Sequence, residues 1–128
     1  MPQKQISHYQ IVARVHRPIP PLNRSAMAGS VNIYDIYLYN KSGKKLNKLA
    51  ELSFYTGSAD SWPDDYYTEP KGDKYLVVSC STDAFSGVVD ILRNETNRYF
   101  QWEDPKGGRA LATISTAAEP TGEGDSTP

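Results

Sequence analysis

The segment Val31–Tyr39 constrains the fold most strongly, because it is apolar on both faces of a strand. Val31, Ile33, Tyr37 and Tyr39 alternate with Tyr34, Ile36 and Leu38. A strand of this kind is typical of the centre of a sheet that is covered on both sides. The cover must therefore come from other parts of the chain or from a second subunit.

Alternating and apolar segments predict several further strands. A chain of 128 residues fits one domain with one core. Lys44–Tyr55 returns after a turn at 40–43 and predicts a hairpin with the central strand. The segment Thr56–Asp73 has no usable periodicity, and a loop of this length is often functional or mobile. The remaining expected strands are Tyr9–His16, Lys74–Ser81, Arg98–Trp102 and Arg109–Ser115.

One amphipathic helix is expected at Asp83–Arg93, with Thr82 or Asp83 as its N-cap. Its apolar side chains follow the i, i+3, i+4, i+7 pattern and are Phe85, Val88, Val89 and Leu92.

The predicted fold class is α+β and predominantly antiparallel, with about six strands and one short helix packed on a face. Since one helix cannot cover such a sheet on both sides, either the sheet curls into a partial barrel or subunits pack face to face. The domain is expected to span residues 1–116. Residues 117–128 form an acidic tail with proline and glycine, which predicts a flexible segment.

The charge of the chain is balanced overall but unevenly spread. The net charge is −1 and the pI is about 6.1, which argues against a dedicated nucleic-acid binder. Residues 1–50 carry eight Lys and Arg and one acid, a net charge of +7, whereas residues 51–128 have a net charge of −8. Interleaved charges in one fold are one interpretation. The other is a basic face for an anion, or complementary faces that make a homo-oligomer.

No recognisable catalytic, cofactor or metal motif is present in the sequence, so no cofactor is expected. His8 and His16 would lie about 26 Å apart on one strand, too far to share a metal ion. The single cysteine, Cys80, cannot form an internal disulfide. No apolar segment is long enough to span a membrane, and no secretory signal is visible. These features predict a cytoplasmic protein without a membrane partner.

Two groups of residues make a candidate ligand site. Arg14, His16 and Arg17 supply positive charge at the first expected strand, and the long loop supplies flat side chains. A base or sugar ring would lie on these aromatic side chains, which are Trp62, Tyr66 and Tyr67. The loop acids Asp60, Asp64 and Asp65 would repel an anion. The alternative is therefore a protein partner that contacts the loop, with Trp62 buried at the centre.

Two segments resemble small bacterial β-rich proteins to which no function is attached. The segments are 88–95, VVDILRNE, and 119–125, EPTGEGD. The resembling proteins pair a strand–helix–strand segment with a similar Glu-Pro-x-Gly-Glu-Gly ending. The resemblance covers about the last 50 residues and implies a bacterial intracellular setting.

The sequence thus predicts a small, non-enzymatic binding or interaction domain that self-associates. One alternative is a binder of a small anionic or nucleotide-like ligand. A second alternative is an enzyme without a recognisable motif.

Overall fold

The computed structural model describes residues 3–15, 30–69, 74–105 and 108–116. The expected tail at 117–128 lies outside the described residues. The strands are β1 (Gln3–Gln5), β2 (His8–Ala13), β3 (Asn32–Ser42), β4 (Lys45–Tyr55), β5 (Tyr66–Thr68), β6 (Tyr75–Ser81), β7 (Arg98–Trp102) and β8 (Ala112–Thr116). The helix is α1 (Phe85–Asn94), and two short 3-10 turns are η2 (Ala59–Ser61) and η3 (Thr82–Ala84).

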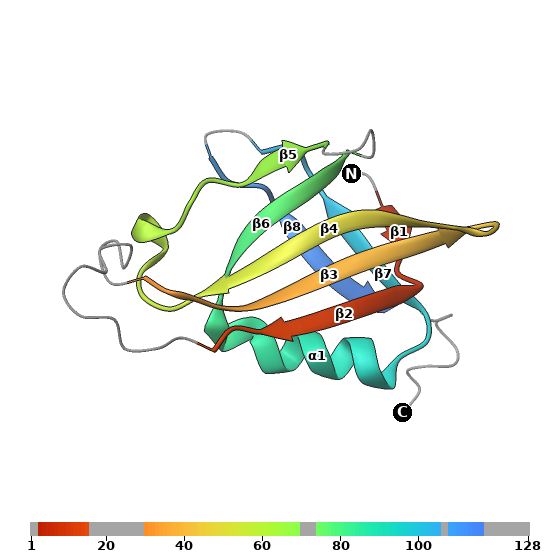
Figure 1. Cartoon of the computed structure of the whole chain (residues 1–128), viewed down its shortest axis with the longest axis horizontal. Helices are drawn as coiled ribbons and strands as arrows, with labels where there is room; N and C mark the ends of the chain where they lie inside the picture. Colours follow the sequence, from red (N-terminus) through yellow and green to blue (C-terminus); the bar gives the residue numbers. More distant parts are fainter. Residues whose placement is uncertain (1–2, 16–29, 70–73, 106–107, 117–128) are drawn as a thin grey trace, which may run out of the picture.

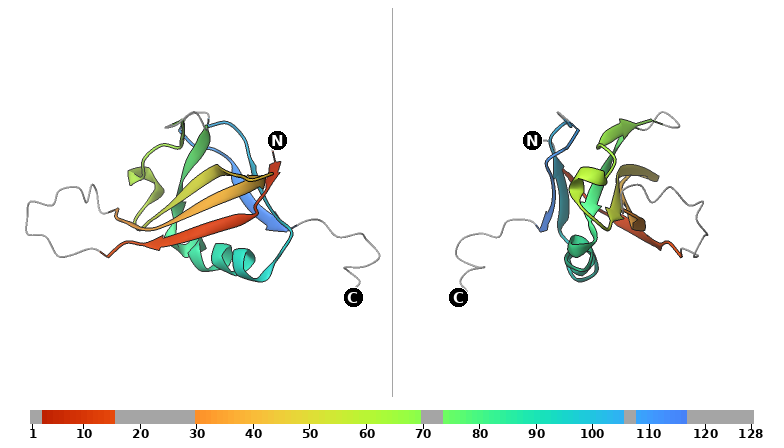
Figure 2. Two further views of the ribbon diagram at one scale, coloured as in Figure 1. Left: turned by 45° about the vertical axis from the view of Figure 1, so that its right-hand side comes forward. Right: turned by 90° about the vertical axis from the view of Figure 1, so that its left-hand side faces the viewer.

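The strands form two sheets that face each other. The five-stranded sheet has the order β2-β3-β4-β6-β5, and the three-stranded sheet has the order β1-β7-β8. Only β4 and β6 pair in parallel; the other described pairs are antiparallel. The helix α1 lies along the lower opening between the sheets (Figures 1 and 2).

The α+β class is confirmed, with two differences from the sequence prediction. The described residues form eight strands rather than six, and the sequence did not predict β1 and β5 because three residues are too few to show a periodicity. The strands also do not curl into one partial barrel. The chain instead crosses from one sheet to the other at Ile6 and Ser7, so that two open sheets cover each other.

The central position of the two-sided strand is confirmed. Strand β3 pairs with β2 on one side and β4 on the other, and its residues Ile36 and Leu38 are fully buried. The three-stranded sheet and α1 supply the cover on this inner side. The buried core residues are Ile6, Ile36, Leu38, Ala50, Leu52, Phe54, Leu76, Val78, Leu92 and Phe100.

The expected β3–β4 hairpin is also confirmed, and it contains a bulge. Gly43 makes the turn with a positive φ of 64°. Leu38 pairs with Ala50, but Tyr39 pairs with Lys48, so Leu49 is an extra residue in β4. Such a bulge changes the direction in which the following side chains point.

The helix begins after a 3-10 turn, which moves its cap. Ser81 accepts a hydrogen bond from the Asp83 backbone N–H, a role expected for Thr82 or Asp83. The Phe85 ring stacks on Tyr34, with ring centroids 3.9 Å apart, and meets Phe54 edge-on at 5.3 Å. The predicted apolar face of the helix therefore does pack against the core.

Replacing Leu92 should destabilise the fold substantially. Leu92 is 1% exposed at the centre of the core, so Leu92→Ala leaves a cavity and should lower the free energy of unfolding by about 2–5 kcal/mol. Urea denaturation measures the change. The control is Leu111→Ala, since Leu111 is 56% exposed. Equal losses in the two variants would contradict this packing of α1.

Candidate functional site

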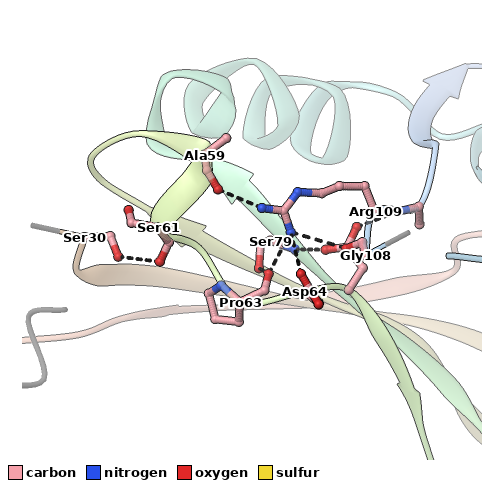
Figure 3. Close-up of polar contacts among 10 residues, drawn as sticks. Ser30, Ala59, Ser61, Pro63, Asp64, Ser79, Gly108 and Arg109 are labelled. Atoms are coloured by element: carbon pink, nitrogen blue, oxygen red, sulfur yellow. Dashed lines mark hydrogen bonds and ion pairs between the residues drawn. The ribbon is translucent and has the colours of Figure 1, made fainter. Parts of the chain in front are cut away.

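The segment 56–69 is folded and held in place by Arg109. Its guanidinium donates to the Pro63 carbonyl at 2.9 Å and to the Ala59 carbonyl at 2.7 Å (Figure 3). The Ser79 hydroxyl donates to the same Pro63 carbonyl at 2.9 Å. The part of the expected loop around Ala59 and Pro63 is therefore attached to β6 and to the segment before β8.

The Asp65 carboxylate connects the two sheets. One oxygen accepts from the Ser79 backbone N–H of β6 at 2.8 Å, and the other accepts from the Ala110 N–H at 2.7 Å. The Asp65 N–H donates to the Gly108 carbonyl at 2.8 Å. Asp65 is 6% exposed, so this carboxylate has a structural role instead of repelling a ligand.

Gly108 permits this close approach of the two segments. Its φ is +95°, and a Cβ at this position would lie 2.7 Å from the Asp64 carboxylate. Asp64 itself is exposed and lies 3.9 Å from the Arg109 guanidinium.

The structure places Arg14 in an internal ion pair. Its guanidinium donates to Asp35, a fully buried carboxylate that also accepts from the Asn32 amide at 3.2 Å. The positive charge of Arg14 is thus matched within the protein. His16 and Arg17, the other predicted cations, lie outside the described residues.

The three predicted aromatic residues do not converge. Trp62 donates from its indole to the Thr56 carbonyl at 3.1 Å and stacks on Tyr55. Tyr66 and Tyr67 are neighbours in β5, so their side chains point to opposite faces of the sheet. Tyr66 is 51% exposed, whereas Tyr67 packs against the core.

Tyr67 lines a pocket of about 430 Å³ where β4 and β6 begin and β7 ends. The pocket joins residues of both sheets. Its lining residues are Lys4, Asn40, Asn47, Lys48, Leu49, Tyr67, Lys74, Tyr75, Leu76 and Trp102.

Hydrogen bonds fix the aromatic wall of the pocket. The Trp102 indole N–H donates to the Tyr67 hydroxyl oxygen at 3.0 Å, and the Tyr67 hydroxyl donates to the Asp104 carboxylate. Burial and the bond to Asp104 raise the pKa of Tyr67, so its hydroxyl stays neutral at physiological pH. The Trp102 ring also stacks on Phe100 at 5.3 Å.

Two lysines place positive charge at the pocket. The Lys74 ammonium lies 4.3 Å from the centroid of the Tyr67 ring, and Lys4 is exposed at the opposite sheet. Lys48 also lines the pocket, and its ammonium lies over the rings of Tyr37 and Tyr75 at 4.5 and 4.7 Å from their centroids. The charged residues of this lining are all lysines, whose charge favours an anion, and the Asp104 carboxylate that contacts the wall is engaged by the Tyr67 hydroxyl.

Sequence reasoning did not identify Lys4, Lys74, Asn47 or Trp102 as site residues. They lie on four separate segments, and no spacing pattern connects them. The signal that existed was weak: Lys4 precedes the buried Ile6, and Trp102 ends a strand before a turn.

A second hollow, of about 300 Å³, lies between the sheets beside Cys80. Its walls include Leu52, Phe54 and Phe100. Burial is the main cause that raises the pKa of the Cys80 thiol to about 12. The thiol is therefore protonated at physiological pH and is a weak nucleophile.

No group of three or more metal-ligating side chains occurs in the part of the chain that the structure describes. Within the same residues, no helix is long and apolar enough to cross a membrane. Comparisons with models of protein families, with curated proteins and with solved structures found no match to this chain.

The Asp65 bridge predicts a specific loss of stability. Asp65→Asn keeps the shape of the side chain but turns an NH₂ group toward a backbone donor, so one buried N–H loses its acceptor. We expect the free energy of unfolding to fall by about 1–3 kcal/mol in urea denaturation. The matched control is Asp64→Asn, whose exposed ion pair should contribute less than about 1 kcal/mol. Similar effects of both changes would contradict a specific role for Asp65.

Proposed function

We propose that this domain binds a small anion with a flat ring, without catalysis, in the pocket between the two sheets. The observation that carries the proposal is the composition of the pocket wall. Lysines and aromatic rings line it together, and none of its lining residues is acidic.

The pocket offers a separate contact for each part of such a ligand. Lys4 lies in β1 of one sheet and Lys74 immediately before β6 of the other, and both would hold the negative charge by charge-assisted hydrogen bonds. The Trp102 ring and the side chains of Leu49 and Leu76 give a flat or apolar surface for the ring. A volume of about 430 Å³ falls in the range of small-ligand sites.

The lining residues support binding rather than chemistry. They include no His, Cys, Ser, Asp or Glu, and the hydroxyl of Tyr67 is already engaged with Asp104 and Trp102. A nucleophile with an adjacent base is therefore not part of this wall. The single cysteine of the chain supports a reducing, cytoplasmic setting for the domain.

Loss of either lysine should weaken the binding of phenyl phosphate, which combines one ring with one phosphate group. Because both ammonium groups are exposed, we expect Lys4→Ala and Lys74→Ala each to lower the affinity about threefold to tenfold in isothermal titration calorimetry. Added salt should weaken the wild-type complex.

The matched control is Lys41→Ala, which removes the same charge from an exposed residue outside the pocket wall. The proposal fails if the wild type binds neither phenyl phosphate nor any other phosphate that carries a flat ring at millimolar concentration. It also fails if Lys41→Ala weakens binding as much as Lys74→Ala.

We also propose that the domain self-associates through β2, because this strand has an open edge among the described strands and carries the exposed side chain of Ile11. Strand β2 pairs with β3 alone among the described strands, and Ile11 on it is 36% exposed. An open edge of this kind can pair with the same edge of a second copy. Sedimentation should give a dimer for the wild type and a monomer for Ile11→Lys, whose charge opposes edge pairing. A wild-type monomer at tens of micromolar, at both low and high salt, would contradict this proposal.

A further inference from the structure

We infer that the ring accepted by the pocket is a nucleobase, so that the ligand class is a nucleoside monophosphate. This inference rests on the proposed anion-binding function and adds the chemistry of the ring. Its basis is a pair of asparagine side chains in the same pocket wall.

Asn40 and Asn47 lie directly opposite each other on β3 and β4, and both line the pocket. The Cβ atoms of such a pair are about 5 Å apart. The two side-chain amides therefore form a continuous polar strip between the apolar side chains of Leu49 and Leu76 and the rim lysines.

The β-bulge at Leu49 accounts for the direction of Asn47. Without the extra residue, strict alternation from the inward Ala50 would place Lys48 inside and Asn47 outside. With it, the Lys48 ammonium lies over the Tyr37 and Tyr75 rings, and Asn47 lines the pocket beside Asn40. The bulge thus brings a second neutral amide into the pocket wall beside Asn40, while Lys48 also lines the pocket with its ammonium held over the two rings.

The two amides differ in what they have left to offer a ligand. The Asn40 NH₂ group donates one N–H to the Gln5 carbonyl at 2.8 Å, which fixes this side chain and leaves its oxygen and its second N–H for a ligand. The Asn47 side chain has no hydrogen bond to the described residues and keeps both a donor and an acceptor. Asn47 is half-buried, so the strip is partly shielded from water.

A donor beside an acceptor is the pattern that the edge of a nucleobase presents. Asparagine pairs with such an edge through two parallel hydrogen bonds, as it does with adenine in DNA recognition. A plain phenyl ring would leave the amides of the strip without partners, and a polar site of this kind discriminates strongly against the analogue that lacks the polar groups. The base would then lie against Trp102, with the phosphate at Lys4 and Lys74.

The test is a comparison of ring chemistry at constant charge. The probes are AMP, GMP, CMP, UMP, phenyl phosphate and ribose 5-phosphate, titrated into the full chain by calorimetry. At least one nucleotide should bind about tenfold more tightly than phenyl phosphate and than ribose 5-phosphate. A 5′-phosphorylated octanucleotide is a further arm. If it binds as tightly as the best mononucleotide, the source of the base and phosphate is the end of a nucleic acid.

The Asn47→Ala variant isolates the amide. It should remove the preference for the nucleotide and leave the affinity for phenyl phosphate within about twofold of the wild type. The matched control is Asn97→Ala, which changes an exposed asparagine outside the pocket and should keep the preference.

The outcomes separate this inference from the proposed function. If phenyl phosphate binds in a manner that depends on Lys74 but no nucleotide binds more tightly, the nucleobase is wrong and anion binding stands. An unchanged preference in Asn47→Ala also overturns the inference. If neither phenyl phosphate nor any nucleotide binds, both proposals fail. If Asn47→Ala does not fold, the wild-type comparison of nucleotides with phenyl phosphate and ribose 5-phosphate alone tests the nucleobase.

Discussion

The structure depends on a few side chains that connect two sheets, whose described strands share no hydrogen-bond ladder. Asp65 is the clearest of them, because its two carboxylate oxygens accept backbone N–H groups from β6 and from the segment before β8. Arg98 has the same role elsewhere in the interface. Its guanidinium donates to the Leu92 carbonyl at the end of α1 and to the Ile6 and Ser7 carbonyls where the chain changes sheets. The hydrophobic effect favours packing of the two sheets but has no preferred direction. The charged hydrogen bonds of Asp65 and Arg98 are directional and therefore fix the relative orientation of the sheets.

The position of the pocket follows from these connections. Asp65 immediately precedes β5, a strand of three residues that pairs with β6 alone among the described strands, so the carboxylate helps to determine where β5 begins. The Tyr67 hydroxyl in β5 then contacts Trp102 at the end of β7 and Asp104, two residues after that strand. Tyr67 in the pocket wall is therefore a second connection between the sheets, and it lies two residues after the first connection, Asp65. A ligand held by Lys4 and Lys74 would add a third, since these lysines belong to opposite sheets or the segments beside them.

Elements with many residues of regular alternation could be predicted from the sequence, and the short or irregular ones could not. The two-sided pattern of β3 and the apolar spacing of α1 repeat over enough residues to identify each element. Strands β1 and β5 have three residues each, and the bulge at Leu49 depends on the pairing with β3.

The residues of the candidate site were harder to predict from the sequence than the strands and the helix. Tyr66 and Tyr67 are adjacent in sequence but face opposite ways, and Arg14 is neutralised by Asp35, a residue 21 positions away. The sequence analysis therefore assigned Tyr66, Tyr67 and Arg14 to one site because of their positions along the chain, whereas the folded structure does not bring them together.

The uneven charge of the two halves of the chain shows why composition alone does not locate a site. The net charge of +7 on residues 1–50 left two interpretations open, interleaved charges or a basic face. The cations at the pocket come from both halves of the chain and include Lys4 and Lys74. Several other charges are used within the fold: Asp35 pairs with Arg14, and Asp65 accepts backbone N–H groups. Lys48 is directed by the bulge to the rings of Tyr37 and Tyr75. A chain with a net charge of −1 can thus present a locally positive pocket, because strand pairing decides which charges remain available to a ligand.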